Sequence, residues 1–438
     1  MFLACSDGGE GTGPFEPGAA PPRRSNIILI VIDTLRADHL GAYGYARKTS
    51  PNIDALAAQS LVYERAISPA PWTTPAIGAL LTSLYPTTLG IDDRQSSLAE
   101  EHLLLSEVLQ RRGWATGAVI SHHFCSSRWN FDQGFDAFDE SNVQGHRAVT
   151  SPAVTDRGLE FITAREGEPF FLWLHYFDPH VAYVEHEGHT FPDEGAYRGP
   201  IASGQDFKTL LAIKPSITTA DLGELRRLYD SDIAFTDHAV GRLLEGLKTR
   251  GLYDDAVVIL TADHGEEFFE RGGLGHAKTV HQELIHVPLM IKLPGVEPRR
   301  ITEPVSLVDI YPTILEFLDE PVPDGLAGRS ILPEALDTAG GRHPVFSETR
   351  RGNDMRAVID GDVKLLVNRR TGRSEFYRLD SDPAERHDLA AREPEEVARL
   401  RSLMDTWVRR SEARVRPGAD VTLSPEEREQ LEALGYRE

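Results

Sequence analysis

Apolar runs that end in polar residues recur along the chain, and amphipathic stretches separate them. The runs are "NIILIVID" (26–33), "EPFFLWLHYFDPH" (168–180) and "DAVVILTADHGEE" (255–267). Continuous apolar runs of this length are typical of strands in a parallel sheet, because helices cover both faces of such a sheet. Residues 219–250 carry the spacing of a long amphipathic helix. The alternation predicts an α/β fold, a sandwich with a mainly parallel central sheet.

Shorter elements complete this pattern and divide the chain. Further helices are expected at 51–60, 102–114 and 305–319, and a further strand at 115–120. After about Pro333 the pattern changes to short strands joined by turns such as "IDGD" and "RTGR", and a charged helix follows at 393–410. We therefore expect a linker without fixed structure at 1–25, a catalytic domain at 26–335 and a small C-terminal α+β subdomain at 336–438.

The overall charge narrows the class of partner. The 438 residues carry a formal net charge of −22, which argues against a nucleic-acid partner, because phosphate backbones bind clustered lysine and arginine. An anionic small molecule stays compatible with this charge, since a bound metal ion reverses the sign of the local field. We therefore expect no nucleic acid, and the charge leaves a small anionic substrate open.

The N-terminus carries the sequence feature that bears on location. Only two cysteines occur in the chain. Cys5, in "FLAC", precedes a tether rich in glycine and proline, as at the end of a bacterial lipoprotein signal. The apolar region that should precede it is missing, so this is either a truncated signal or a tail with an incidental cysteine. The first interpretation predicts a membrane tether through Cys5 and a periplasmic, envelope or extracellular location. No later segment is long and apolar enough to span a bilayer.

Acidic residues and histidines stand where the predicted strands end. Asp33 follows the first run, Asp178 and His180 follow the second, and Asp263 with His264 follows the third. Ligands of parallel α/β sheets bind beyond the carboxyl ends of the strands. Carboxylate oxygen and imidazole nitrogen can hold one divalent ion together. A turn-capping aspartate beside a surface histidine would give the same local pattern, but the convergence of two strand ends favours a metal site.

A threonine occupies a position suited to anion chemistry. Thr73 lies two residues before Pro75, in the first turn of a predicted helix "PAIGALLTSLY". A hydroxyl there faces unpaired backbone N–H groups and suits the binding and transfer of an anionic group. An ordinary N-cap threonine would look the same locally. His180 and His276 are expected near the same sheet edge, where each could donate a hydrogen bond to a substrate oxygen or protonate a leaving group.

The ordered series of motifs resembles the sulfatase family of the alkaline phosphatase superfamily. The segments are "NIILIVIDTLRADHLGAYGYARKTSPNIDALAAQSLVYERAIS", "PWTTPAIGALLTSLYP", "HYFDPH", "LTADHGEEF", "GHAKTVHQELIHVPLMIKLPG" and "VSLVDIYPTILEFL", and the tail "KLLVNRRTGRSEFYRLDSDPAERHDLA" is similar to the family's small C-terminal domain. The resemblance implies an alkaline phosphatase/sulfatase-like sandwich. It also implies one divalent metal ion, Ca²⁺, Mg²⁺, Mn²⁺ or Zn²⁺, and an anionic ester or a glycan or lipid headgroup as substrate.

The resemblance also assigns roles to individual residues. It makes Asp33, Asp263 and His264 ligands of the metal ion. Thr73 falls at the nucleophile position and becomes a further ligand when deprotonated. His180 and His276 match histidines that contact the transferred group. Near the family's "GKWH" segment this chain has "ISHHF", where His123 is expected to contact the substrate.

Three departures from the family pattern bear on the chemistry. Family sulfatases carry cysteine or serine in a C/S-x-P-x-R pattern and oxidise it to formylglycine, whereas this chain has Thr73 there and Ile77 at the arginine position. The second of the paired aspartates is Thr34. A hydrated aldehyde expels sulfate by elimination from its second hydroxyl, and threonine has no such group. An in-line displacement at phosphorus needs no second hydroxyl.

The sequence therefore leaves three functions open, in order of preference. The first is a metal-dependent hydrolase or transferase of phosphoesters that uses Thr73 as nucleophile. The second is a sulfuric ester hydrolase that works without formylglycine. The third is a catalytically degenerate protein that binds an anion without turnover. The substrate, the metal and the oligomeric state are not fixed by the sequence.

Overall fold

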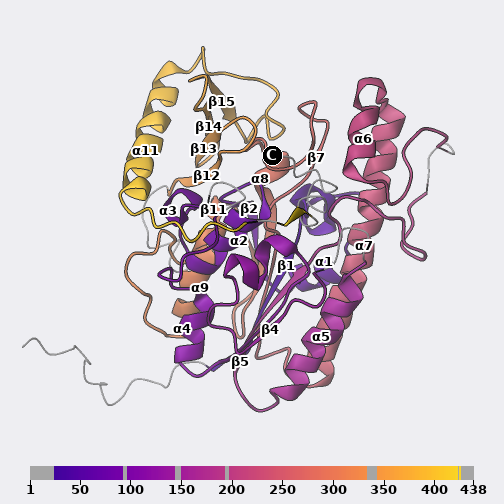
Figure 1. Cartoon of the computed structure of the whole chain (residues 1–438), viewed down its shortest axis with the longest axis vertical. Helices are drawn as coiled ribbons and strands as arrows, with labels where there is room; N and C mark the ends of the chain where they lie inside the picture. The colour runs from indigo at the N-terminus through magenta and orange to yellow at the C-terminus, as the bar shows by residue number, and fades with distance from the viewer. Residues whose placement is uncertain are drawn as a thin grey trace, which may run out of the picture.

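A large central sheet and a smaller second sheet organise the molecule (Figure 1). The structure, a computed structural model, describes residues 24–91, 96–143, 149–192, 197–332, 343–422 and 424–425. The large sheet has nine strands along the path β10-β2-β9-β6-β1-β5-β3-β4, with β11 also paired to β2. These strands are β1 (Ile27–Ile32), β2 (Leu61–Ile67), β3 (Ala115–Val119), β4 (Ala137–Asp139), β5 (Phe170–Tyr176), β6 (Val257–Thr261), β9 (His286–Lys292), β10 (Arg299–Ile301) and β11 (Val305–Ser306).

The central strands are parallel and fully buried, as their apolar sequences predict. β1 pairs in parallel with β5 on one side and β6 on the other. All six residues of β1 are buried, because helices cover both faces of the sheet. β9 is antiparallel to its neighbours β2 and β6. The expected α/β fold with a mainly parallel sheet is confirmed.

Two groups of helices flank the sheet (Figure 1). One group packs together as α1 (Pro51–Ala57), α5 (Ser151–Ala164) and α7 (Thr219–Thr249), and the other as α2 (Thr73–Thr82), α4 (Leu105–Arg111) and α9 (Ile310–Phe317). The long helix expected at 219–250 is α7. It begins with a capping box, in which Thr218 Oγ1 accepts from the Asp221 amide at 3.2 Å and Asp221 Oδ2 accepts from the Thr218 amide at 2.7 Å.

The remaining elements are short and lie mostly in the connections. The helices are α3 (Pro86–Leu89), α6 (Phe207–Ile213) and α8 (Gln282–Ile285), and the 3₁₀ turns are η1 (Ala37–His39), η2 (Gly41–Tyr43), η3 (His123–Cys125), η4 (Ser127–Trp129), η5 (Lys214–Ser216) and η6 (Leu307–Asp309). A two-stranded hairpin joins β7 (Glu267–Phe268) to β8 (Leu274–Gly275). Of the helices that the structure describes, none is long and apolar enough to cross a membrane.

The C-terminal part is an α+β unit whose apolar core also includes side chains of the preceding part of the chain, such as Tyr85 and Val308. Its antiparallel sheet runs in the order β12 (Val345–Thr349), β13 (Met355–Asp360), β14 (Val363–Asn368) and β15 (Ser374–Arg378), and α11 (Pro394–Glu412) packs on it. The rings of Phe346 and Trp407 stack 4.6 Å apart at an interplanar angle of 3°. The predicted boundary at 335/336 and the linker with Cys5 lie outside the described residues, so both stay predictions.

The C-terminal unit touches the catalytic domain next to the residues of interest. The Glu348 amide donates to the Pro69 carbonyl at 2.9 Å, just before α2. The Thr349 hydroxyl donates to the Ala277 carbonyl at 2.8 Å, just after β8. The end of β12 therefore fixes both the segment that leads to Thr73 and the segment that carries His276.

Candidate active site

The ends of β1 and β6 bring two carboxylates and an imidazole together. Because β1 and β6 are adjacent and parallel, with Val31 opposite Thr261, the chain leaves both strands at the same edge. Among the described residues, Asp33, Asp263 and His264 form a group whose potential ligand atoms lie within 4.8 Å of one another. His264 Nε2 lies 3.7 Å from Asp33 Oδ1 and 3.5 Å from Asp263 Oδ2.

The burial and missing hydrogen bonds of these carboxylates are consistent with a bound cation. Both Asp33 oxygens and Asp263 Oδ2 are buried and lack a hydrogen-bond partner within the described part of the chain. Burial and the neighbouring Asp263 raise the pKa of Asp33 well above its ordinary value. Buried, unpaired carboxylates this close are costly unless a positive charge compensates them. The donor set of two carboxylates and one imidazole suits a divalent ion.

The tautomer of His264 agrees with this arrangement. His264 Nδ1 lies 2.9 Å from the Gly265 carbonyl, which can only accept, so Nδ1 carries the hydrogen. Nε2 is then the ring nitrogen that faces Asp33 and Asp263. A backbone carbonyl that fixes the second ring nitrogen is typical of metal-binding histidines.

Thr34, which replaces a second aspartate, does not turn its side chain into this group. Thr34 has a positive φ of 55°. Its hydroxyl donates to the Asp33 carbonyl at 2.7 Å, while its amide points at Asp263 Oδ1 at 3.3 Å. The site therefore has one carboxylate fewer than the family pattern, as the sequence indicated.

Thr73 is the first residue of α2 and faces the same group. Its Oγ1 lies 3.3 Å from His264 Nε2, and the residue is fully buried. The neighbouring Thr74 instead donates to the Phe124 carbonyl at 3.0 Å. Of two adjacent threonines, the structure thus brings Thr73 to the candidate metal site. Ile77, at the position of the family's arginine, is fully buried in the apolar core.

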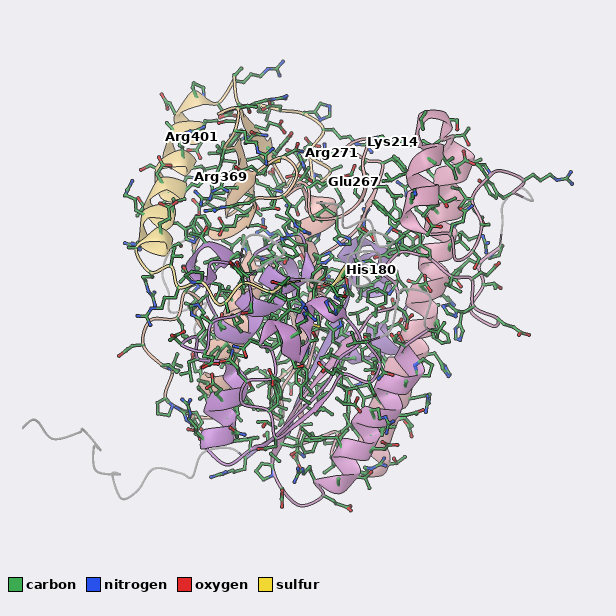
Figure 2. All side chains as sticks on the ribbon, in the orientation of Figure 1. His180, Lys214, Glu267, Arg271, Arg369 and Arg401 are labelled. Carbon is green, nitrogen blue, oxygen red and sulfur yellow. The ribbon has the colours of Figure 1, made fainter. Side chains whose placement is uncertain are left out.

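His180 and His276 complete one side of the site. Their ring centroids are 5.0 Å apart, and the His276 ring lies 4.5 Å from that of His264. Figure 2 shows His180 near the middle of the view, within the ribbon. His180 Nδ1 lies 2.8 Å from the Val181 carbonyl and therefore carries the hydrogen. Burial, reinforced by His276, holds the pKa of His180 well below its ordinary value, so the neutral ring presents an acceptor at Nε2.

His123, which the sequence predicts to contact the substrate, lies among aromatic side chains, and its role stays a prediction. Its ring packs against Phe124 and Trp129, with centroids 5.7 and 6.2 Å away. The neighbouring His122 lies at the site instead, with Nε2 3.9 Å from Asp33 Oδ2. His122 Nδ1 accepts from the Phe124 amide at 3.0 Å, so Nε2 carries the hydrogen and is a donor. The turn η3 decides which of the two histidines faces inwards.

Substituting the two adjacent histidines should separate their contributions. His122→Asn keeps an acceptor for the Phe124 amide but removes the Nε2 donor. We expect kcat/KM to fall by about tenfold to a hundredfold, the cost of one hydrogen bond to a charged group. His123→Asn should change kcat/KM by less than about threefold, because its ring packs against Phe124 and Trp129. Equal losses in both variants would contradict this placement.

Two further site residues were missed from the sequence. His175 lies on β5 with Nε2 3.8 Å from Asp33 Oδ2, and burial lowers its pKa to about 4. Its signal was a histidine inside an apolar strand. Glu266, two residues after His264, lies 3.0 Å from His276 Nδ1. Asp178, in contrast, does not join the site, because its Oδ2 caps the start of α5 through the Ser151 amide at 2.7 Å.

The site lies at the carboxyl edge of an α/β sheet. It combines buried carboxylates and imidazoles with a hydroxyl at the start of a helix, an arrangement typical of metal-dependent hydrolases. Comparison with known proteins gives the family. The family model Sulfatase matches residues 25–320, more than half of the chain. The chain therefore belongs to the sulfatase family of hydrolases, in the alkaline phosphatase superfamily.

Individual relatives resemble the chain over most of its length. The uncharacterized sulfatase YidJ of Escherichia coli is 24% identical over 421 residues, which cover 84% of this chain and 83% of that protein. The structure of BT4656 with D-glucosamine-2-N,6-O-disulfate has a TM-score of 0.73 at 19% identity, over 90% of this chain and 99% of that one. The phosphonate monoester hydrolase of Agrobacterium radiobacter has a TM-score of 0.72 at 21% identity, over 89% and 96%. These structural likenesses confirm the fold.

Proposed function

We propose that this protein hydrolyses anionic esters with Thr73 as the nucleophile, and that its substrates are phosphoesters rather than sulfate esters. The observation that carries the proposal is the position of Thr73 Oγ1, 3.3 Å from His264 Nε2 at the first turn of α2. Backbone N–H groups at a helix start favour an anionic group. Asp33, Asp263 and His264 would hold the metal ion. When bound, a divalent ion lowers the pKa of a hydroxyl and neutralises charge on the ester.

The residues of the chain then divide the reaction between them. Thr73 Oγ1 forms a bond to phosphorus while the bond from phosphorus to the leaving oxygen breaks, and the hydroxyl proton passes to water. The leaving oxygen takes a proton from Nε2 of His276 in its imidazolium form, which leaves the ring neutral. In the second step water attacks phosphorus and gives a proton to His276. The bond from phosphorus to Oγ1 breaks, and Thr73 recovers a proton from solvent.

The other histidines bind and orient the substrate. His122 donates from Nε2 to an oxygen of the transferred group, and neutral His180 accepts at Nε2 from a substrate hydroxyl or from water. Both side chains are buried, so these hydrogen bonds form away from bulk solvent and are stronger there. The buried rings of Phe124 and Phe177 contact the His122 ring and cover it on this side.

The preference for phosphate follows from the nucleophile. A threonine that carries a sulfate or phosphate group has no second hydroxyl on the same carbon. It therefore cannot release this group by elimination, as a hydrated aldehyde does. Release must come from attack at phosphorus or sulfur. Ile77 also removes the arginine of the family pattern. Phosphoesters accept in-line displacement, and we therefore place them first.

A sulfate ester is the second candidate. The BT4656 structure contains D-glucosamine-2-N,6-O-disulfate as its substrate, which supports a sulfated sugar as an alternative for a chain of this family. Direct attack of Thr73 at sulfur would be required in that case. A protein that only binds an anion is the third candidate, but the convergence of Thr73, His264 and His276 supports turnover.

A panel of substrates tests the proposal. The wild-type protein, with Ca²⁺, Mg²⁺, Mn²⁺ or Zn²⁺ added back after EDTA, is assayed on bis(4-nitrophenyl) phosphate, 4-nitrophenyl phosphate and 4-nitrophenyl sulfate. We expect kcat/KM for one of the phosphoesters to exceed that for the sulfate by at least about 100-fold, a difference of about 2.7 kcal/mol in transition-state stabilisation. A higher value for the sulfate would overturn the preference. If the protein turns over none of the three substrates with any of the four ions, the proposal of a protein that only binds an anion is favoured instead.

A further inference from the structure

Three histidines at the site differ in the hydrogen-bond partner of Nδ1. In His264 and His180 the partner is a backbone carbonyl, at 2.9 Å from Gly265 and 2.8 Å from Val181. In His276 the partner is Glu266 Oε1, a carboxylate oxygen at 3.0 Å. An ionised carboxylate can only accept a hydrogen bond, so beside it the Nδ1 of His276 carries the hydrogen, and Nε2 is the nitrogen that can act on a substrate.

Glu266 is itself held in place on several sides. It is fully buried, just beyond the end of β6. Arg36 donates to the Glu266 backbone carbonyl at 2.9 Å, which fixes the chain at this residue. The side chain of Tyr183 lies next to the carboxylate. Glu266 is therefore a buried acceptor on a fixed segment of the chain, although its Oε2 has no hydrogen-bond partner among the described residues.

The backbone next to His276 is shaped for this contact. The hairpin of β7 and β8 returns the chain, so that residues 266 and 276 face each other across it. Gly275 has a φ of 86°, a conformation that favours glycine. A Cβ at Gly275 would also lie 2.8 Å from the ring of Phe207. The turn brings the His276 ring back over His264.

We propose that Glu266 is a positioning residue, which accepts from Nδ1 and holds the His276 ring in one orientation, so that in the imidazolium form the Nε2–H meets the leaving oxygen of the ester. The expected effect on kcat rests on the proposed function, whereas the hydrogen bond between His276 Nδ1 and Glu266 does not. Without this acceptor, the ring is free to rotate, and its Nε2–H no longer points at the leaving oxygen. The proton transfer to the leaving group is then lost, although the substrate still binds.

The kinetic test compares Glu266→Ala, Glu266→Gln and Glu267→Gln. Glu267, labelled above His180 in Figure 2, is the matched control, because its Oε1 accepts from the Arg271 and Gly273 amides and not from His276. Substrates are an alkyl phosphoester, whose leaving oxygen needs a proton, and a 4-nitrophenyl phosphoester, whose leaving group does not. For each variant and the wild-type protein, kcat and KM are measured on both substrates.

We expect Glu266→Ala to lower kcat on the alkyl ester by about 100-fold or more, within the usual contribution of general acid catalysis, with KM changed by less than about threefold. The loss on the 4-nitrophenyl ester should be at least about tenfold smaller, because its leaving group departs unprotonated. Glu266→Gln should recover about tenfold, since the amide oxygen still accepts from Nδ1. Equal losses on both esters, or no loss, would overturn the inference.

A spectroscopic measurement keeps the inference testable if Glu266→Ala fails to fold. The 15N shifts of the His276 ring are measured in the wild-type protein, with a His276→Gln variant to assign the signals. We expect the hydrogen on Nδ1. A neutral ring with the hydrogen on Nε2 would contradict the role of Glu266 without any kinetic assay. If no ester is turned over but the hydrogen is on Nδ1, the proposed function fails and the positioning contact stands.

Discussion

Replacing Thr73 by alanine should lower kcat on the preferred phosphoester by at least about 10⁴-fold, because loss of a nucleophile removes the covalent step and not only a contact. Thr73 is buried, and its Oγ1 lies against His264 Nε2. Alanine removes the hydroxyl and the γ-methyl group but keeps Cβ and the start of α2, so the fold and the three other metal-site residues should persist. The measurement is kcat with metal content determined on the same samples.

The neighbouring threonine supplies the control. Thr74→Ala removes a hydroxyl of the same kind from the same turn of α2, but this hydroxyl donates to the Phe124 carbonyl and not towards the site. We expect a loss of stability of about 1 kcal/mol and a change in kcat of less than about fivefold. A Thr73→Ala variant that keeps more than a tenth of the wild-type kcat would remove Thr73 from the mechanism, whatever Thr74→Ala does.

The second large effect concerns the metal group. Asp263→Asn should abolish stoichiometric binding of the divalent ion, since it removes one of two carboxylates from a three-residue group. In the wild-type protein, an ion at a concentration of 100 times its Kd stabilises the fold by about 2.7 kcal/mol, and EDTA should remove this stabilisation. In Asp263→Asn, the melting temperature should not respond to either addition. Metal content by mass spectrometry and thermal unfolding with and without EDTA measure both effects.

Asp309→Asn is the matched control for this effect. Asp309 is also buried, but its oxygens accept from the Ser306 and Arg329 amides, each at 2.9 Å, away from the group. This variant should be less stable than the wild type but should still gain stability from the ion. A full equivalent of ion bound to Asp263→Asn would contradict the assignment of the site.

Much of this arrangement could be predicted from the sequence because strand ends in a parallel sheet converge. Asp33 and Asp263 were expected at one edge of the sheet, and the structure shows in addition that β1 and β6 are adjacent. The position of Thr73 followed from Pro75 and the start of α2. These inferences depend on local spacing and on one general rule of sheet topology.

Features that depend on side-chain direction could not be predicted in this way. His122 and His123 are adjacent, and the cap that His122 Nδ1 gives to the Phe124 amide decides which ring faces Asp33. Asp178 ends a strand as Asp33 does, yet a helix start 27 residues earlier in the chain takes its carboxylate.

Contacts between residues that are distant along the chain could not be predicted from the sequence either. Glu266 and His276 are ten residues apart, and the hairpin between them sets their contact. His175 lies in a run that reads as an ordinary buried strand, and its approach to Asp33 comes from the pairing of β1 with β5. In both cases the relevant neighbour is distant along the chain, so the spacing of residues carries no signal of it.

Trapping the covalent intermediate tests the central claim most directly. The loaded wild-type protein is mixed with bis(4-nitrophenyl) phosphate, quenched with acid within the first turnover, digested and analysed by peptide mass spectrometry. We predict a 4-nitrophenyl phosphoryl group on the hydroxyl of Thr73, absent from the Thr73→Ala variant. Turnover of the ester with no adduct on Thr73 at any time, or with an adduct on another residue, would contradict the account.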